Sequence, residues 1–256
     1  MEVGTMLSKV GKWLDLNLDD EKLVLPVEEK EIELTDEQKI QEMFKYIYGH
    51  DKLKKLFYMA LHADDPVHII LKGSPGTAKT LFLEAIEENV EDTTFITSNA
   101  TGPGLLHHIY DDPDMKYLCI DEIEKIPRTE IGVLLTLMES GRLIITKKTM
   151  MVNRKQKLRI FATCNDVNKL SPEMQSRFLK LHLNEYTYPE FHMVAKNLVC
   201  GKFKKSEALA DKIADVIWNK VESRDIRDVI KVARLTKDPN EVDFVLDTLE
   251  QYKEHE

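Results

Sequence analysis

The chain has 256 residues, 43% of them hydrophobic and 32% charged, so it can bury a core and is not a disordered chain. A formal charge of −9 argues against attraction of the whole molecule to DNA or to an anionic membrane. Three widely spaced cysteines without a C-x-x-C pair argue against a zinc site or a disulfide framework, and the apolar runs are too short to span a bilayer, so we expect a cytoplasmic protein with no membrane partner.

Residues 1–38 are acidic and irregular, and we interpret them as an N-terminal extension. A helix near Lys9–Leu16 and an extended piece near Leu23–Val27 are predicted within it. Residues 39–62 carry apolar groups at helical spacing, and this pattern is broken at Tyr48-Gly49-His50.

Strands and helices then alternate along the chain. Short apolar runs predict strands at Val67–Leu71, Phe95–Thr97, Tyr117–Ile120 and Leu158–Thr163. Helices are predicted between them at Thr80–Asn89, Leu105–Ile109 and Glu130–Glu139. This alternation predicts an α/β domain over 39–185, with a parallel sheet sandwiched by helices.

The pattern changes near Glu185–Tyr188, beyond which only amphipathic helices are expected. They are predicted at Pro189–Val199, Ser206–Glu222, Arg224–Leu235 and Glu241–Tyr252. We therefore predict a small all-α lid domain over 186–256.

A phosphate-binding loop is predicted between the first strand and the following helix. Residues 73–80, GSPGTAKT, match G-x-x-x-x-G-K-[ST], with Ala78 in place of the second glycine. Backbone N–H groups here can surround a phosphate at a helix N-terminus, while Lys79 reaches the β- and γ-oxygens and Thr80 binds Mg²⁺. The predicted ATP-binding residues are Gly73, Ser74, Pro75, Gly76, Thr77, Ala78, Lys79, Thr80 and Leu81. The alternative is a chance turn.

An acid pair, Asp121-Glu122, ends the apolar run that starts at Tyr117. Ligands bind where the strands of a parallel sheet end. We expect Asp121 to hold Mg²⁺ and Glu122 to polarise the attacking water as general base. Solvated carboxylates follow many strands, but a pair about 40 residues after a P-loop is typical of nucleotide hydrolases.

In these motifs the chain resembles the AAA+ ATPases, from about Lys45 to Leu235. It is most similar to the clade of minichromosome maintenance (MCM) helicases and MoxR-type ATPases. A RuvB-like archaeal or viral DNA motor is a further protein type that the resemblance suggests. The alanine in GTAK is itself similar to the MCM loop. Ile120–Lys125 resembles the Walker B sequence, and Leu134–Asn165 resembles a helix, a β-hairpin and the sensor-1 strand.

The resemblance implies roles for further residues. It places Tyr48, Gly49 and His50 near the adenine, and Asn165 at the γ-phosphate as sensor 1. It assigns Arg177 of Ser176-Arg177-Phe178 to the γ-phosphate of a neighbouring subunit, which requires a homo-oligomeric ring, by resemblance a hexamer. It offers Arg224 as sensor 2, with Arg227 as the runner-up. The alternatives are a turn asparagine, a surface ion pair and a solvated helix face.

A basic segment interrupts the acidic chain between Ser140 and Asn165. It holds seven basic and no acidic residues, which leaves −16 on the rest of the chain. Leu143–Thr146 and Thr149–Val152 are predicted to pair as a hairpin around Lys147-Lys148. We expect Arg142, Lys147 and Lys148 to contact DNA; the alternative is a solvated edge hairpin whose lysines block aggregation.

Three functions are compatible with these patterns. The favoured one is an ATP-hydrolysing DNA motor, a helicase or branch-migration enzyme. The acidic body and the lack of a separate DNA-binding domain favour a MoxR-type protein remodeller instead. A nucleotide-regulated scaffold without turnover fits less well, because Lys79, Asp121, Glu122 and Arg177 are all present.

Overall fold

The computed structural model describes residues 34–97, 104–147 and 150–252. Thr35–Glu256 forms one compact unit. The predicted elements at Lys9–Leu16 and Leu23–Val27 lie outside the described residues. In the described ranges, every helix is too short or too polar to cross a membrane.

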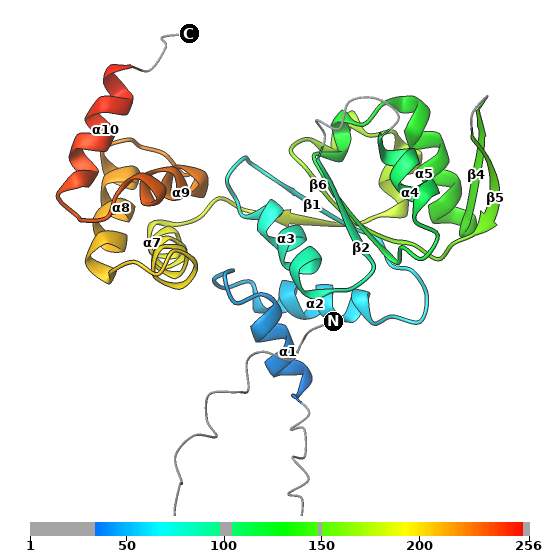
Figure 1. Cartoon of the computed structure of the whole chain (residues 1–256), viewed down its shortest axis with the longest axis horizontal. Helices are drawn as coiled ribbons and strands as arrows, with labels where there is room; N and C mark the ends of the chain where they lie inside the picture. Colours follow the sequence, from blue (N-terminus) through cyan, green and yellow to red (C-terminus); the bar gives the residue numbers. More distant parts are fainter. Residues whose placement is uncertain (1–33, 98–103, 148–149, 253–256) are drawn as a thin grey trace, which may run out of the picture. The chain divides into compact units, whose positions relative to one another are not determined.

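A five-stranded parallel sheet forms the centre of the α/β part (Figure 1). Its order is β2 (Thr93–Thr97), β3 (Tyr117–Asp121), β6 (Arg159–Cys164), β1 (Ile69–Gly73) and β7 (Leu179–Leu183). The four predicted strands are confirmed. The edge strand β7 was not predicted.

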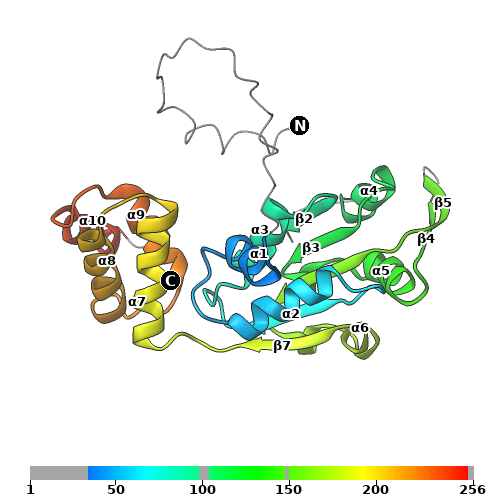
Figure 2. The ribbon, with the colours of Figure 1, turned by 90° about the horizontal axis from the view of Figure 1, so that it is seen from below.

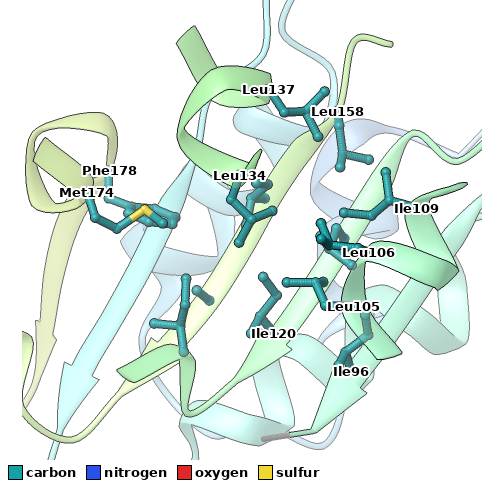
Figure 3. Packing of buried hydrophobic residues seen from close by; sticks show 14 of the residues in the cluster. Ile96, Leu105, Leu106, Ile109, Ile120, Leu134, Leu137, Leu158, Met174 and Phe178 are labelled. Carbon is teal, nitrogen blue, oxygen red and sulfur yellow. The ribbon is translucent and has the colours of Figure 1, made fainter. Parts of the chain in front are cut away.

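Helices cover both faces of this sheet, as the α/β prediction requires (Figures 1 and 2). On one face, α4 (Gly104–Asp111) and α5 (Arg128–Ser140) pack on Ile70, Leu118 and Ile120, in the apolar cluster of Figure 3. On the other, α2 (Asp51–Leu61) and α3 (Lys79–Asn89) pack on alternate residues of the same strands, among them Ile69, Leu71, Cys119 and Phe161. The short helix α1 (Asp36–Met43) adds to this second layer.

Aromatic packing anchors the helix that follows the P-loop. The Phe82 ring of α3 lies 5.2 Å from that of Phe57 on α2, which in turn stacks at 5.5 Å on Phe161 of β6. All three side chains are fully buried, and each contributes about 2–3 kcal/mol on burial. The start of α3 is therefore held firmly against the sheet.

The predicted hairpin is present and longer than expected. β4 (Arg142–Lys147) pairs antiparallel with β5 (Met150–Lys155), with Arg142 opposite Lys155 and Lys147 opposite Met150. Leu143 and Ile145 are buried against the α4–α5 layer. After β6, the short helix α6 (Pro172–Arg177) leads into β7.

From Tyr188 to Gln251 the described secondary structure is helical, as predicted. The helices are α7 (Tyr188–Lys196), which continues into a π-helical turn at Asn197–Lys202, α8 (Glu207–Asn219), α9 (Ile226–Leu235) and α10 (Glu241–Gln251). Their apolar faces form one cluster around Phe191, Ile213 and Val229. The domain boundary between 185 and 186 stays a prediction.

The start of α9 differs from the prediction that a helix begins at Arg224. The Asp225 carboxylate accepts a hydrogen bond from the Arg227 N–H and so caps the helix, whose first residue is Ile226. Arg224 therefore lies in the loop before α9.

Candidate nucleotide-binding site

The P-loop joins β1 to α3, and two of its residues have left-handed backbones. Gly76 has φ +80° and Ala78 has φ +61°. This conformation costs a non-glycine residue about 1–2 kcal/mol, which explains why the motif normally carries glycine at position 78. The Ala78 methyl is buried in the cluster of the C-terminal helices, and that burial offsets part of the cost.

The loop's glycines allow close packing. A Cβ on Gly73 would lie 2.6 Å from the Leu183 carbonyl oxygen, and one on Gly76 would lie 2.5 Å from the Asp225 Cα. Any larger residue would therefore displace β7 or the start of α9. Asp225 is consequently fixed beside the loop.

Lys79 is the buried cation of the loop. The residue is only 6% exposed, and its Nζ donates to the carbonyl oxygens of Gly73 and Ser74, each at 2.7 Å. Burial lowers the pKa of Lys79, and the charge of Asp121 opposes that effect. Within the described part of the chain, no carboxylate forms an ion pair with it. A desolvated cation at a helix N-terminus is suited to an anion such as phosphate.

The other predicted loop residues differ in burial. Ser74 and Pro75 are exposed, the Thr77 hydroxyl donates to the Ser74 carbonyl at 2.9 Å, and Leu81 packs against the apolar clusters.

Thr80 and Asp121 come together at the end of β3. The Thr80 hydroxyl lies 3.2 and 3.3 Å from the two Asp121 carboxylate oxygens. Thr163 of β6 donates to the same carboxylate at 2.5 Å. Hard oxygen donors that converge in this way fit Mg²⁺, which prefers one or two protein ligands with water and phosphate oxygens.

Glu122 is held by three neighbouring groups. Its backbone is left-handed at φ +56°, and its N–H donates to the Thr163 hydroxyl at 2.9 Å. Its carboxylate accepts from the Asn165 amide at 3.1 Å and from the Lys125 ammonium at 2.5 Å. The predicted base and the predicted sensor 1 therefore lie side by side. A φ above zero at a bulky residue is a strain that functional sites tolerate.

Sequence reasoning missed Thr163 and Lys125. Thr163 donates to the Asp121 carboxylate and accepts from the Glu122 backbone N–H because the strands β3 and β6 are neighbours. The signal for Thr163 was its place two residues before Asn165. The signal for Lys125 was a helical spacing of three residues from Glu122.

A cavity of about 730 Å³ lies beside the residues expected near adenine. It is lined from one side by Tyr48, Gly49 and Lys54, and from the other by residues of α7 and the turn after it, including Met193 and Asn197. His50 does not line it; its ring lies 6.3 Å from Phe82 and 6.4 Å from Tyr186, and burial lowers its pKa.

Arg177 is the last residue of α6, and its polar contacts among the residues described are with Glu139 and Ser176, not with P-loop residues. Its guanidinium forms an ion pair with Glu139 at 3.0 Å and a hydrogen bond with the Ser176 hydroxyl at 3.4 Å. Its buried Nε has no hydrogen-bond partner among the described residues. These contacts are compatible with a role toward another molecule.

The two sensor-2 candidates differ in their surroundings. The Arg224 guanidinium lies 3.6 Å from the centre of the Trp218 ring and donates to the Trp218 carbonyl. Arg227 pairs with Asp225 at 2.6 Å, beside the P-loop. The charges of Arg227 and Lys79 interact, as do those of Arg227 and Glu122. Of the two candidates, the runner-up Arg227 is the one for which charge interactions with Lys79 and Glu122 are found.

The basic segment is only partly available for a ligand. Arg154 donates to the carbonyls of Ile109 and Tyr110, and Arg159 to that of Ala63. Lys157 pairs with Asp65 at 3.3 Å. Of the predicted DNA contacts, Arg142 is exposed at the start of β4, Lys147 ends β4, and Lys148 lies outside the described residues.

Comparisons with known proteins agree with this geometry. The model of the AAA domain, dynein-related subfamily, matches residues 113–178. The DNA replication licensing factor mcm2 of Schizosaccharomyces pombe is 24% identical over 70% of this chain, which spans about a quarter (26%) of that relative. A point mutant of Thermotoga maritima RuvB superposes with a TM-score of 0.60 at 21% identity, over 81% of this chain and 71% of the other. A structure titled as the RuvB Holliday junction branch migration motor of the same organism gives 0.56 at 20% identity, over 79% and 69%. The fold is that of AAA+ P-loop NTPases.

Proposed function

We propose that this AAA+ ATPase-type chain binds ATP·Mg²⁺ and hydrolyses it as a subunit of a homo-oligomeric ring, a hexamer, that acts on DNA. The observation that carries the ATPase proposal is the buried Lys79 beside the Thr80–Asp121 and Glu122–Asn165 pairs. No other arrangement in the described residues combines an anion site, hard oxygen ligands and a general base.

Each group then has a chemical task. Lys79 and the N–H groups at the start of α3 bind the β- and γ-phosphates, and the cavity beside Tyr48 and Gly49 receives the base. Thr80 and Asp121 hold Mg²⁺, which neutralises developing phosphate charge when bound.

The catalytic carboxylate is Glu122, which accepts a proton from the attacking water. Asn165 and Lys125 hold it in place until that step. Arg177 serves the neighbouring subunit's nucleotide, and Arg227 serves its own, in preference to Arg224.

The ATPase proposal is tested by two substitutions. Lys79→Ala should abolish ATP binding in calorimetry, because the principal cation of the phosphate site is removed; unchanged affinity would refute the P-loop assignment. Glu122→Gln should bind ATP normally and hydrolyse it about 10²-fold more slowly or worse. Wild-type turnover in that variant would remove Glu122 from the mechanism.

The trans role of Arg177 has its own test. Arg177→Ala subunits mixed with Lys79→Ala subunits should regain some activity, because an intact interface site can form from the two. Rings shown to be mixed that gain no activity at any ratio would place Arg177 in its own subunit's chemistry.

The choice of DNA as substrate rests on the relatives' titles and on the exposed cations of the hairpin. We expect single-stranded, duplex or branched DNA to raise the ATPase rate, and Lys147→Ala/Lys148→Ala to abolish that stimulation. A wild-type protein that neither binds DNA at low salt nor responds to it would favour the protein remodeller.

A further inference from the structure

Glu124 is a partly buried carboxylate just beyond the end of β3. It lies on the short 3₁₀ helix η1 (Ile123–Lys125), which directly follows the proposed base Glu122. The Ile123 side chain is fully buried in the apolar cluster of Figure 3, and η1 packs against β6. The backbone of Glu124 is therefore held in a fixed place beside the ends of β3 and β6.

The Glu124 side chain reaches across to the residue that follows β6. Its Oε1 accepts a hydrogen bond from the Asn165 backbone N–H at 2.8 Å. The Asn165 side-chain amide donates to the Glu122 carboxylate at 3.1 Å. Asn165 is thus held at two points, by its backbone through Glu124 and by its side chain through Glu122. A hydrogen bond to a charged acceptor contributes about 1.5–3 kcal/mol, so the contact with Glu124 can fix the direction of the Asn165 amide.

The second carboxylate oxygen argues against a purely stabilising role for Glu124. Its Oε2 is buried and has no hydrogen-bond donor among the described residues, and none of their cations forms an ion pair with it. A buried acceptor without a donor costs about 1–3 kcal/mol. The hydrogen bond to Asn165 does little more than offset that cost, so a contribution to the site explains this carboxylate better than a contribution to folding.

A purely electrostatic role toward the phosphates is the weaker explanation. Burial lowers the pKa of Lys79, and the charge of Asp121 opposes that effect more than the charge of Glu124 does. A role through charge on the phosphate site would change ATP affinity. A role in holding Asn165 would change the hydrolysis rate instead, so the two explanations can be separated.

We propose that Glu124 is a positioning residue for hydrolysis, which fixes the Asn165 backbone so that the Asn165 amide stays aligned with Glu122 and the attacking water. This inference rests on the proposed ATPase function and adds a further carboxylate to it. Glu124 acts through Asn165 and does not touch the reacting atoms. A misplacement of about 1 Å can cost about 10²-fold in rate, so loss of this hydrogen bond slows hydrolysis without weakening ATP binding.

The test is a double-mutant cycle on the full chain, with the hydrolysis rate measured at saturating ATP and ATP affinity measured by calorimetry. Glu124→Ala should lower the rate at least about tenfold and leave ATP affinity within about twofold of wild type. In an Asn165→Ala background, the same substitution should change the rate by less than about twofold, because no amide is left to align. Glu124→Gln keeps an acceptor for the Asn165 N–H and should keep most of the wild-type rate.

Hydrogen exchange of the Asn165 amide, followed by NMR, reports the contact without turnover. Exchange should be about tenfold faster or more in Glu124→Ala and close to wild type in Glu124→Gln. The thermal midpoint of Glu124→Ala should stay near that of wild type, because the lost hydrogen bond and the removed unpartnered oxygen oppose each other. The matched control, Glu87→Ala, removes an exposed carboxylate of α3 and should leave the rate and the affinity unchanged.

Two results would overturn the positioning role while the proposed function stands. One is an additive loss of rate in the Glu124→Ala/Asn165→Ala double variant, and the other is a Glu124→Gln variant as slow as Glu124→Ala. A wild-type protein without ATP turnover would overturn the proposed function itself, and any role of Glu124 in hydrolysis with it.

Discussion

Acidification should destabilise this protein through His68, the residue that precedes β1. The residue is 7% exposed, and its Nδ1 accepts a hydrogen bond from the Ile160 N–H at 3.1 Å. Burial lowers the pKa of His68 to about 4, against a weaker opposing hydrogen bond with the Met138 backbone. Protonation at Nδ1 would convert this acceptor into a donor facing another donor.

The size of the effect follows from the difference in pKa. The unfolded chain protonates His68 near 6.5 and the folded chain near about 4, so the unfolded state binds the proton first as pH falls. Full stability is present above pH 6.5 and is lost between 6.5 and 4. At 1.36 kcal/mol per pH unit, the loss approaches about 3 kcal/mol at pH 4.

Urea unfolding of wild type and His68→Asn from pH 7.5 to 4.5 tests this value. Asparagine can still accept from the Ile160 N–H but cannot titrate, so carboxylate effects common to both proteins cancel in the difference. The variant should be less stable at pH 7.5, and the gap should narrow by about 2–3 kcal/mol at pH 4.5. A constant gap, or an NMR titration of His68 near pH 6.5, would refute the reasoning.

Four further substitutions follow from the site. Thr163→Val should lower the hydrolysis rate at least about tenfold with little change in ATP affinity, because it removes the hydroxyl that aligns both Asp121 and Glu122. Steady-state kinetics will measure the rate and calorimetry the affinity; an equal fall in rate and affinity would contradict this role. Arg227→Ala should slow hydrolysis more than Arg224→Ala, whereas Arg224→Ala should lower the thermal midpoint through its lost contact with Trp218; the reverse order in either measurement contradicts the assignment. Ala78→Gly should change the free energy of unfolding by less than about 1 kcal/mol, since relief of the left-handed backbone and loss of a buried methyl oppose each other.

Local patterns predicted much of this fold because each is read from neighbouring residues. The four predicted strands contain short apolar runs, and the P-loop motif is contiguous. β7 was missed because Leu179–Leu183 alternates apolar with basic residues at the sheet edge, where three of its five residues are exposed. Its strand character comes from pairing with β1, a partner more than 100 residues earlier in the chain.

The site was predicted less completely where contacts depend on the tertiary fold. Thr163 reaches Asp121 only because β3 and β6 are adjacent. The count of seven basic residues could not show that Arg154 and Arg159 bind backbone carbonyls. The stacking of Arg224 on Trp218 likewise depends on how α8 ends.

The ion pair between Arg177 and Glu139 connects the arginine proposed to act on nucleotide with the helix that precedes the hairpin proposed to contact DNA. Glu139 lies in the last turn of α5, three residues before β4 begins, so a displaced hairpin would pull on the arginine. Suppose that DNA binding shifts Arg177 toward the next subunit and so raises that subunit's affinity for its nucleotide. Thermodynamic reciprocity then requires the bound nucleotide to raise the affinity for DNA by the same factor. We expect Glu139→Gln to bring that factor toward one in DNA titrations with and without bound nucleotide. The Glu139 side chain would then determine how strongly the DNA affinity of each subunit depends on ATP bound at the neighbouring subunit.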